Sequence, residues 1–192
     1  MGKLVEVRWH GRGGQGAKTG AMLLAEAASV AGKFVQGFPE YGPERMGAPM
    51  LAFDRISDDP IGLHCHVTSP NVVIVLDPTL IGKIDVTEGL TEDGVIVINT
   101  HQPPQEMRSK LGLKGRKVFT VDASRISIET IGREIPNTPL MGAVIRVTGL
   151  MDFGKFIEVM KDELTAKFRN KPEVIEGNLK AINRAFEEVQ GE

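Results

Sequence analysis

Four glycines within six residues form the stretch of this sequence that is most clearly shaped for chemistry. The stretch reads Gly11, Arg12, Gly13, Gly14, Gln15 and Gly16. The alternating run 5–10 before it predicts a strand, and the pattern from Ala17 to about Gly32 predicts a helix. Glycines allow a tight turn whose N–H groups approach an anion, and the helix dipole favours negative charge there. The stretch therefore predicts a phosphate-binding turn; the alternative is a turn that only packs a strand closely on a helix.

Two nucleotide-binding motifs come close to this turn without matching it. A triphosphate-binding loop has glycine directly before its lysine and another glycine five residues earlier. Those two places hold Ala17 and Arg12 here. A dinucleotide-binding fold has a carboxylate at the end of its second strand, and residues 35–37 contain no acid. An NTPase and a stand-alone NAD(P) enzyme are therefore disfavoured, while Lys18 and Thr19, in the first turn of the predicted helix, are candidate anion-binding residues.

A stiff loop is predicted after the second strand. Residues 39–49 include three prolines and have no periodicity, which fixes an irregular loop rather than leaving it floppy. At the end of a second strand in a parallel sheet, this loop lies on the same edge as the glycine turn, where ligands bind. A plain surface connector is the alternative. The residues predicted to face a partner or the active site are Tyr41, Gly42, Pro43, Glu44, Arg45 and Met46.

The remaining strand pattern predicts an α/β fold in one domain, residues 1–192, with a doubly wound, mostly parallel sheet. Short apolar runs that do not alternate predict strands buried on both faces. Two further runs joined by a turn signal predict an antiparallel hairpin inserted at the edge of the sheet. The predicted strands lie at about 3–10, 33–38, 71–77, 94–99 and 117–122, and the hairpin at 50–56 and 61–67.

Helices are predicted between the later strands and at the end of the chain. Thr138, taken as an N-cap residue before Pro139, predicts a helix that ends near Met151. Apolar residues surround its axis, so this helix is expected to be buried. The fold is therefore expected to have a helical C-terminal end. The other predicted helices lie at 78–83, 105–111, 154–169 and 172–189.

The alternation of His64, Cys65 and His66 raises the possibility of a metal site. On a strand, the two histidines share one face, but a zinc site needs at least three protein ligands and no matching second pair stands elsewhere. Cys65, on the opposite face, is predicted to be a buried thiol. No nucleophile elbow, catalytic carboxylate pair or nucleophile–base spacing is visible either. We therefore predict no metal site and no catalytic residue in this chain.

Charge and composition exclude several classes of function. The net charge is −2 with dispersed Lys and Arg, which leaves no electrostatic footprint for nucleic acid. The longest apolar run, 72–76, is too short to cross a membrane, and the N-terminus lacks the apolar core of a signal peptide. A single cysteine excludes an internal disulfide and a Cys-ligated cluster within this chain. A cytoplasmic protein without nucleic-acid or membrane partners is expected.

Four segments, in order along nearly the whole chain, resemble the gamma subunit of 2-oxoacid:ferredoxin oxidoreductases, and most closely those acting on pyruvate. They are the glycine turn 11–16, the loop segment 41–47, the strand end 75–78 and the helix-opening segment 137–143. The family loop often has paired glycines where this chain has Met46 and Gly47. The order of the segments makes the likeness much more specific than the glycine turn alone.

This resemblance implies a multi-subunit enzyme that oxidatively decarboxylates pyruvate to acetyl-CoA and CO2 with ferredoxin as electron acceptor. It implies that thiamine diphosphate and the iron–sulfur clusters belong to alpha, beta and delta-type partner subunits. The chain by itself would then hold no cofactor and be inactive.

For this chain the resemblance implies that it helps to bind coenzyme A and to close the active site. The glycine turn, with Arg12 and Lys18, is then a plausible seat for the phosphates of coenzyme A, and the loop 41–46 a second contact. The alternatives are a free-standing NAD(P)- or flavin-linked oxidoreductase and a purely structural assembly subunit.

Overall fold

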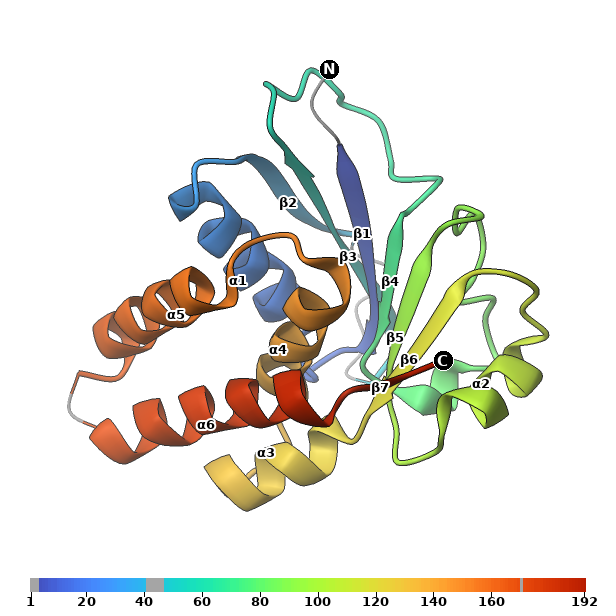
Figure 1. The fold of residues 1–192 in the computed structure, drawn as a ribbon. Coiled ribbons are helices and arrows are strands. Elements are labelled where there is room, and N and C mark those ends of the chain that lie inside the picture. The colour runs from blue at the N-terminus through green and yellow to red at the C-terminus, as the bar shows by residue number, and fades with distance from the viewer. Residues whose placement is uncertain (1–3, 41–46, 170) are drawn as a thin grey trace.

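The computed structural model describes residues 4–40, 47–169 and 171–192, which form a mixed sheet with helices on both faces (Figure 1). Among these residues the sheet has seven strands in the order β2-β3-β1-β4-β5-β6-β7. The strands are β1 (Val5–Arg12), β2 (Phe34–Glu40), β3 (Pro49–Ser57), β4 (Val72–Val75), β5 (Val95–Asn99), β6 (Lys117–Val121) and β7 (Gln190–Gly191). The helices are α1 (Ala17–Val30), the 3₁₀ turn η1 (Pro78–Leu80), α2 (Pro104–Leu111), α3 (Ala123–Ile131), α4 (Asn137–Thr148), α5 (Phe153–Lys167) and α6 (Pro172–Glu188).

The centre of the sheet is parallel, as predicted. Strands β1, β4, β5 and β6 run in one direction, while β3 lies antiparallel between β2 and β1. All four residues of β4 are buried, which explains why this apolar run does not alternate. The short strand β7, which sequence patterning missed, pairs antiparallel with β6.

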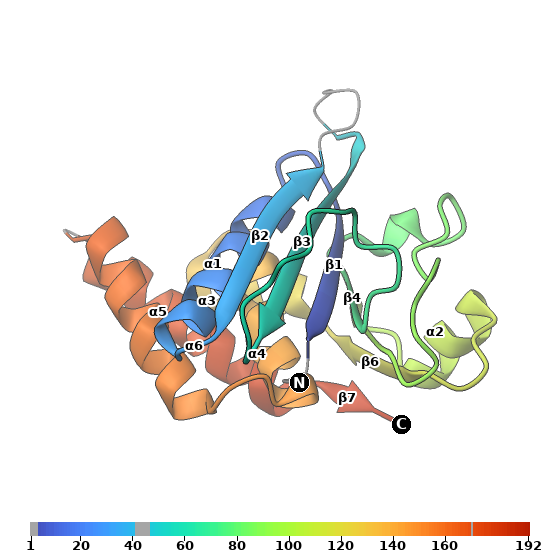
Figure 2. The same ribbon diagram turned by 90° about the horizontal axis from the view of Figure 1, so that it is seen from above.

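Two hydrophobic cores lie on opposite faces of the sheet (Figures 1 and 2). The larger core joins one face to α1, α4, α5 and α6, and the smaller one joins the other face to η1 and α2. Helix α4 has an unbroken run of buried residues from Asn137 to Ile145, because other helices and the sheet surround it. No helix in the described ranges is long and apolar enough to cross a membrane.

Helix α1 lies close to the sheet because its inner stripe consists of small residues. Ala17, Ala21 and Ala28 are almost completely buried. Gly20 faces the indole of Trp9, where a Cβ atom would come within 2.9 Å of a ring carbon. The indole Nε1 donates a hydrogen bond to Asp54 at 2.7 Å, so β1, β3 and the start of α1 are held at fixed separations.

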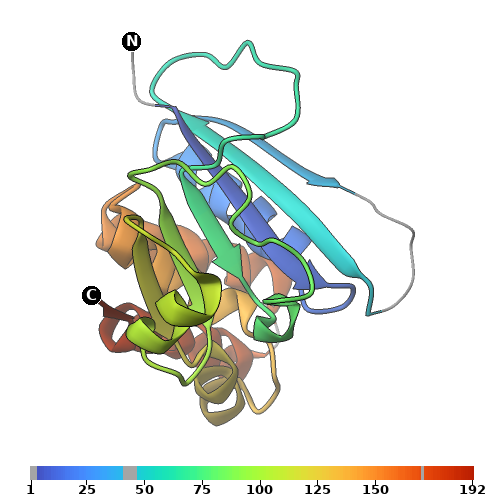
Figure 3. The same cartoon turned by 90° about the vertical axis from the view of Figure 1, so that its right-hand side faces the viewer.

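The predicted hairpin of 50–56 and 61–67 is wrong in its second strand. The antiparallel partners of β3 are β2 and β1, and residues 61–67 form an irregular segment (Figure 3). Side chains, rather than a neighbouring strand, satisfy several of its carbonyl groups. Gln36 donates to the carbonyls of Ile61 and Leu63, and Arg55 donates to that of Cys65. Because this segment lies on the surface, Cys65 is exposed rather than buried.

The predicted cap of the late buried helix is also wrong. Helix α4 begins at Asn137, so Thr138 lies inside its first turn and Pro136 occupies the N-cap position. The helix ends at Thr148, before Gly149 in a left-handed conformation. The other predicted helices are found with ends shifted by one or two residues, except that 78–83 shortens to the 3₁₀ turn η1.

Candidate ligand-binding site

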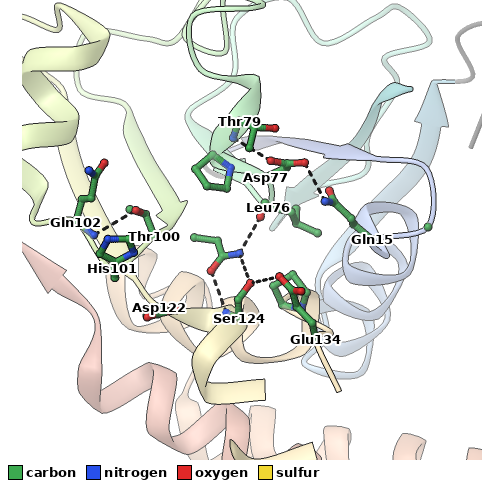
Figure 4. A pocket seen from close by; sticks show the side chains of 14 residues that line it. Gln15, Leu76, Asp77, Thr79, Thr100, His101, Gln102, Asp122, Ser124 and Glu134 are labelled. Carbon is green, nitrogen blue, oxygen red and sulfur yellow. Dashed lines mark hydrogen bonds between the residues drawn. The ribbon is translucent and has the colours of Figure 1, made fainter. Parts of the chain in front are cut away.

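A cavity of about 660 Å³ opens at the carboxyl edge of the parallel strands (Figure 4). Its walls come from the loops after β1, β4, β5 and β6 and from the residues before α4. Strands β2 and β3 lie on one side of β1 in the sheet, and β4, β5 and β6 lie on the other side. The cavity therefore lies at the point where the order of the strands reverses. Open α/β sheets bind ligands in this crevice. The lining residues are Gly14, Gln15, Leu76, Asp77, Pro78, Thr79, Asn99, Thr100, His101, Gln102, Asp122, Ser124, Glu134 and Pro136.

The glycine turn leads from β1 into α1 at one wall of this cavity. Gly16 occupies the N-cap position of α1 with φ 83° and ψ 22°, a left-handed conformation that glycine adopts without strain. Gly16 has no side chain with which to cap α1, and the first turn of the helix contains no acidic residue. The first N–H groups of a helix lack partners within it, so this end of α1 offers donors and a positive dipole to an anion.

Asp77, at the end of β4, holds the glycine turn in place. Its carboxylate accepts a hydrogen bond from Arg12 Nε at 2.8 Å. It also accepts from Gln15 Nε2 and from the N–H of Thr79, both at 2.9 Å (Figure 4). Burial alone would raise the pKa of Asp77, but hydrogen bonds from Thr79, Gln15 and Arg12 lower it below its ordinary value. The carboxylate is therefore charged at neutral pH and ties two neighbouring strand ends together.

Arg12 is engaged with the protein rather than pointing freely towards a ligand. Besides Asp77, its guanidinium donates to the carbonyl of Gly47 and to Thr79 Oγ1, both at 3.0 Å. The N–H of Gly13 donates to the carbonyl of Ala48 at 3.0 Å. Hydrogen bonds thus connect the glycine turn to Gly47 and Ala48, the two residues that directly precede β3.

The opposite wall of the cavity is organised by Asn99, at the end of β5. Its Nδ2 donates to the carbonyl of Leu76 at 2.8 Å and to Ser124 Oγ at 2.9 Å. Its Oδ1 accepts from the N–H of Ser124, whose hydroxyl donates to Glu134 at 2.9 Å (Figure 4). Sequence reasoning missed these residues as site residues. The available signal was a polar residue at or within two residues of the end of each buried strand, namely Asp77, Asn99 and Asp122.

The three carboxylates that line the cavity all accept hydrogen bonds from the protein. Asp77 bonds to Arg12, Glu134 to Ser124, and Asp122 to the N–H of Arg125 at the start of α3. Among the described residues, none of those that line the cavity is a Lys or an Arg. The cavity itself therefore suits hydroxyl and amide groups, while the adjacent end of α1 suits a phosphate.

His10, a buried residue of β1 just before the glycine turn, has surroundings that favour a structural rather than a catalytic role. Arg8 Nε donates to His10 Nε2 at 3.0 Å, and the same guanidinium donates to the carbonyls of Val86 and Glu88. Burial, reinforced by the nearby positive charge of Arg8, lowers the pKa of His10 to about 3. The imidazole is neutral at physiological pH, which disfavours a role in acid–base chemistry.

The structure brings part of the predicted glycine-turn site to the cavity. Gly14 and Gln15 line it, Gly11 is buried against Ala17, and Lys18 and Thr19 are exposed on the first turn of α1. The predicted contact loop, Tyr41, Gly42, Pro43, Glu44, Arg45 and Met46, lies outside the described residues. The described chain ends at Glu40 and resumes at Gly47, and Gly47 bonds to Arg12.

The histidine pair of the sequence is not assembled into a metal-binding cluster. His64 and His66 are exposed in the irregular segment that follows β3. Throughout the part of the chain that the structure describes, no three His, Cys, Asp or Glu side chains are grouped in a way that would hold a metal ion.

Comparison with known proteins shows which family the chain belongs to. Residues 6–188 match the family described as pyruvate ferredoxin/flavodoxin oxidoreductase, so the chain belongs to this family, as its resemblance implied. Pyruvate synthase subunit PorC of Thermotoga maritima is 47% identical over 98% of this chain and 96% of its own. The common gamma subunit of the pyruvate/ketoisovalerate oxidoreductases of Pyrococcus abyssi is 46% identical over 97% of this chain and 98% of its own.

A solved structure supports the same relationship. The crystal structure of pyruvate oxidoreductase subunit PORC from Thermotoga maritima matches with a TM-score of 0.86 and 46% sequence identity. The match covers 98% of each chain. The α/β fold with C-terminal helices is therefore shared across the whole length of a solved relative.

Proposed function

We propose that this chain is the gamma subunit of a multi-subunit pyruvate:ferredoxin oxidoreductase. The complex would convert pyruvate and coenzyme A to acetyl-CoA and CO2, and the two electrons released would pass to ferredoxin. Full-length similarity to subunits named for pyruvate synthase and for pyruvate/ketoisovalerate oxidoreductases supports this assignment. Because one of these relatives serves a second 2-oxoacid, pyruvate is the substrate we propose to test first.

In this proposal, the redox cofactors belong to other subunits. Iron–sulfur clusters are held by sets of cysteine thiolates, and this chain has one cysteine. Thiamine diphosphate and the clusters would therefore lie on alpha, beta and delta-type partners, and the isolated chain would be inactive.

We propose that the chain's own task is to bind coenzyme A and to help close the active site. The observation that carries this proposal is the start of α1, whose N-cap residue Gly16 ends the glycine turn at the edge of the cavity. A phosphate of coenzyme A would accept hydrogen bonds from the first N–H groups of α1, with the exposed Lys18 adding positive charge. Arg12 would act indirectly, since it holds the turn through Asp77.

The neighbouring cavity would receive uncharged parts of the coenzyme. Its carboxylate and carbonyl oxygens can accept hydrogen bonds from the hydroxyl and amide groups of coenzyme A. Binding these groups would orient the thiol towards the acyl group formed on a partner subunit, and it would exclude water from that group. The loop Tyr41–Met46, which follows β2 in the sequence, would face the coenzyme or a partner.

The free-standing NAD(P)- or flavin-linked oxidoreductase is the weaker alternative. The chain matches an oxidoreductase family whose similar members are named as subunits. A dinucleotide site also needs a carboxylate for the ribose hydroxyls, and the acid beside the glycine turn, Asp77, already bonds to Arg12, Gln15 and Thr79.

The test is a valine substitution in the glycine turn of the assembled complex. Gly14 has φ +97° and open space around it, so Gly14→Val changes the turn without a steric clash in the core. We expect the KM for coenzyme A to rise roughly tenfold or more, the loss of about 1.4 kcal/mol of binding energy, with the KM for pyruvate unchanged.

Gly32→Val is the matched control for this experiment. Gly32 follows the other end of α1 with φ +85° and open space, so its substitution strains the backbone equally, away from the cavity. The proposal predicts normal coenzyme A dependence for this control. An unchanged KM for coenzyme A in Gly14→Val would contradict the proposed role of the glycine turn.

A further inference from the structure

Asp54, on β3, is an acidic side chain buried in the layer between α1 and the sheet. Its exposed fraction is 0%. In the sheet it lies opposite Val7 of β1 and Gly37 of β2, and its neighbours on the same face of β3, Ala52 and Ile56, belong to the larger apolar core. An ionised group in such surroundings has lost the water that stabilises its charge. The fold therefore places a carboxyl group where a negative charge is costly.

Only one oxygen of this carboxyl group has a hydrogen-bond partner within the described part of the chain. Its Oδ2 accepts from the indole Nε1 of Trp9 at 2.7 Å, whereas the buried Oδ1 has no partner. A Cβ atom built on Gly37 would lie 3.4 Å from this Oδ1. The same Cβ atom would lie 3.3 Å from Ala25 Cβ and 3.5 Å from Met22 Sδ, so apolar groups of α1 surround the unpaired oxygen. A carboxylate can accept about four hydrogen bonds, and here it has one neutral donor.

The charged groups of the neighbouring elements do not compensate a charge on Asp54. Side chains alternate along a strand, so the charged residues of β1 and Arg55 of β3 lie on the opposite face of the sheet from Asp54 and Val7. The charged residues of α1 and β2 are exposed. The residues concerned are Glu6, Arg8, His10 and Arg12 on β1, Lys18 and Glu26 on α1, and Glu40 on β2. Burial therefore raises the pKa of Asp54 well above its ordinary value, and the hydrogen bond from Trp9 offsets this only in part.

The same carboxyl group supports the contact between the sheet and α1. Helix α1 packs on β2 and β3 (Figure 2). Asp54 holds the indole of Trp9, and Gly20 of α1 lies so close to this ring that a Cβ atom would come within 2.9 Å of it. Ionisation would place a charge beneath α1, and water can reach that charge only if α1 moves away from the strands.

We propose that Asp54 keeps its carboxyl proton in the folded chain at neutral pH and is a pH-sensitive switch for the packing of α1. When the proton passes to water, the charge that remains on Asp54 draws water into the layer, and α1 loosens from the strands. A folded chain that keeps a proton which the unfolded chain has lost becomes less stable as the pH rises above the ordinary carboxyl pKa. This switch goes beyond the proposed function and does not depend on the identity of any ligand.

Urea denaturation of the full chain at a series of pH values from about 5 to about 9 tests the retained proton. Asp54→Asn keeps the size of the side chain and is neutral at every pH. Relative to this variant, the ratio of folded to unfolded wild type should fall by up to about tenfold for each pH unit, until Asp54 ionises in the folded chain. Asp54→Ser, which is also neutral, serves if the first variant does not fold, because the slope with pH is the readout.

Asp58→Asn is the control for this slope. Asp58 forms an exposed ion pair with Lys33, so its replacement should leave the pH dependence of wild type unchanged. A stability difference between wild type and the neutral Asp54 variants that stays constant with pH would overturn the proposal.

The single tryptophan of the chain gives a direct readout of the same proton. Because the indole N–H of Trp9 donates to Asp54, its one NMR resonance should move with a midpoint above about pH 5. A midpoint at or below about pH 4, where an ordinary aspartate titrates, would contradict the retained proton.

Backbone amide hydrogen exchange tests the response of α1. Wild type and Asp54→Asn are compared at the same pH, so the intrinsic pH dependence of exchange cancels. At about pH 9 the amides of α1 should exchange roughly tenfold faster in wild type, and at about pH 5 the two proteins should match. Helix α2, which packs on the other face of the sheet, should exchange equally in both proteins. Equal acceleration of α1 and α2 would show a general loss of stability and would refute a switch at α1.

Discussion

At the scale of single residues, the candidate site is built from polar side chains that join neighbouring strand ends. Asp77 joins the turn after β1 to the end of β4, and Asn99 joins the end of β4 to the start of α3. Each of them satisfies backbone or side-chain groups that would otherwise face the cavity unpaired. These hydrogen bonds therefore help to fix the shape of the cavity.

Replacing Asp77 tests this dependence. Asp77→Asn removes the charge that pairs with Arg12, and hydrogen bonds to charged groups contribute about 1.5–3 kcal/mol. We expect the free energy of unfolding of the purified chain to fall by about 1–2 kcal/mol at pH 7, measured by urea denaturation.

The pH dependence of this effect has a defined sign. The pKa of Asp77 is lowered in the folded chain, so its stabilising contribution is present above the ordinary carboxyl pKa and is lost as the pH falls through the lowered value. The difference between wild type and Asp77→Asn should therefore shrink below about pH 4. Asp58→Asn, at an exposed ion pair with Lys33, is the control and should change stability little. A difference that grows with acidity would contradict this account of Asp77.

The residues of the site were only partly predictable from the sequence. Glycines between a predicted strand and a predicted helix indicate a tight turn, so the turn that contains Gly14 and Gly16 could be predicted from the sequence. The engagement of Arg12 by Asp77 could not, because it depends on β4 lying beside β1, 65 residues further along the chain.

At the scale of elements, the close approach of α4 and α6 helps to fix where α4 begins. Gly142 in α4 lies against the backbone of α6, where a Cβ atom would come within 2.1 Å of the carbonyl oxygen of Ile182. This contact allows α4 to sit deep between the sheet and α6, with its N-terminus at the cavity. The position of Pro136, which precedes α4 in the cavity wall, thus depends in part on Gly142, which does not line the cavity.

Gly142→Ala tests this packing. The added methyl group must push α4 and α6 apart, and overpacking of this kind costs about 1–3 kcal/mol, despite the higher helix propensity of alanine. We expect a lower melting temperature for the purified chain. Gly62→Ala, at a surface position with no atom within 4 Å of the added carbon, should melt like wild type. A Gly142→Ala variant as stable as wild type would show that the two helices separate easily.

The sequence pattern identified the parallel strands and most helices but not all pairings. The runs at 72–75, 95–99 and 117–121 are rich in apolar and β-branched residues. Such runs predict buried strands from the local sequence alone, without knowledge of which strands pair with them. The run 61–67 has similar local propensity, but Gln36 and Arg55 supply hydrogen bonds to its carbonyls in place of a strand. Thr138 failed as a cap because the helix starts two residues earlier than predicted, at Asn137, with Pro136 as its N-cap residue.

At the scale of the whole molecule, the cavity and the glycine turn lie on one edge of the sheet, and the helical layers cover its faces. This arrangement leaves the proposed coenzyme seat at an edge that can be apposed to another subunit. The chain supplies a seat for phosphates and a polar cavity, whereas the proposed reaction also needs thiamine and iron–sulfur chemistry. Association with other subunits is therefore the central claim of the proposed function.

The measurement that tests this claim most directly is the native mass and cofactor content of the assembly that purifies with a tag on this chain, under strictly anaerobic conditions. We predict a hetero-oligomer that contains larger chains, thiamine diphosphate and iron–sulfur clusters, and that reduces ferredoxin only when pyruvate and coenzyme A are both present. Recovery of the tagged chain alone, or only with copies of itself, would contradict the proposed function.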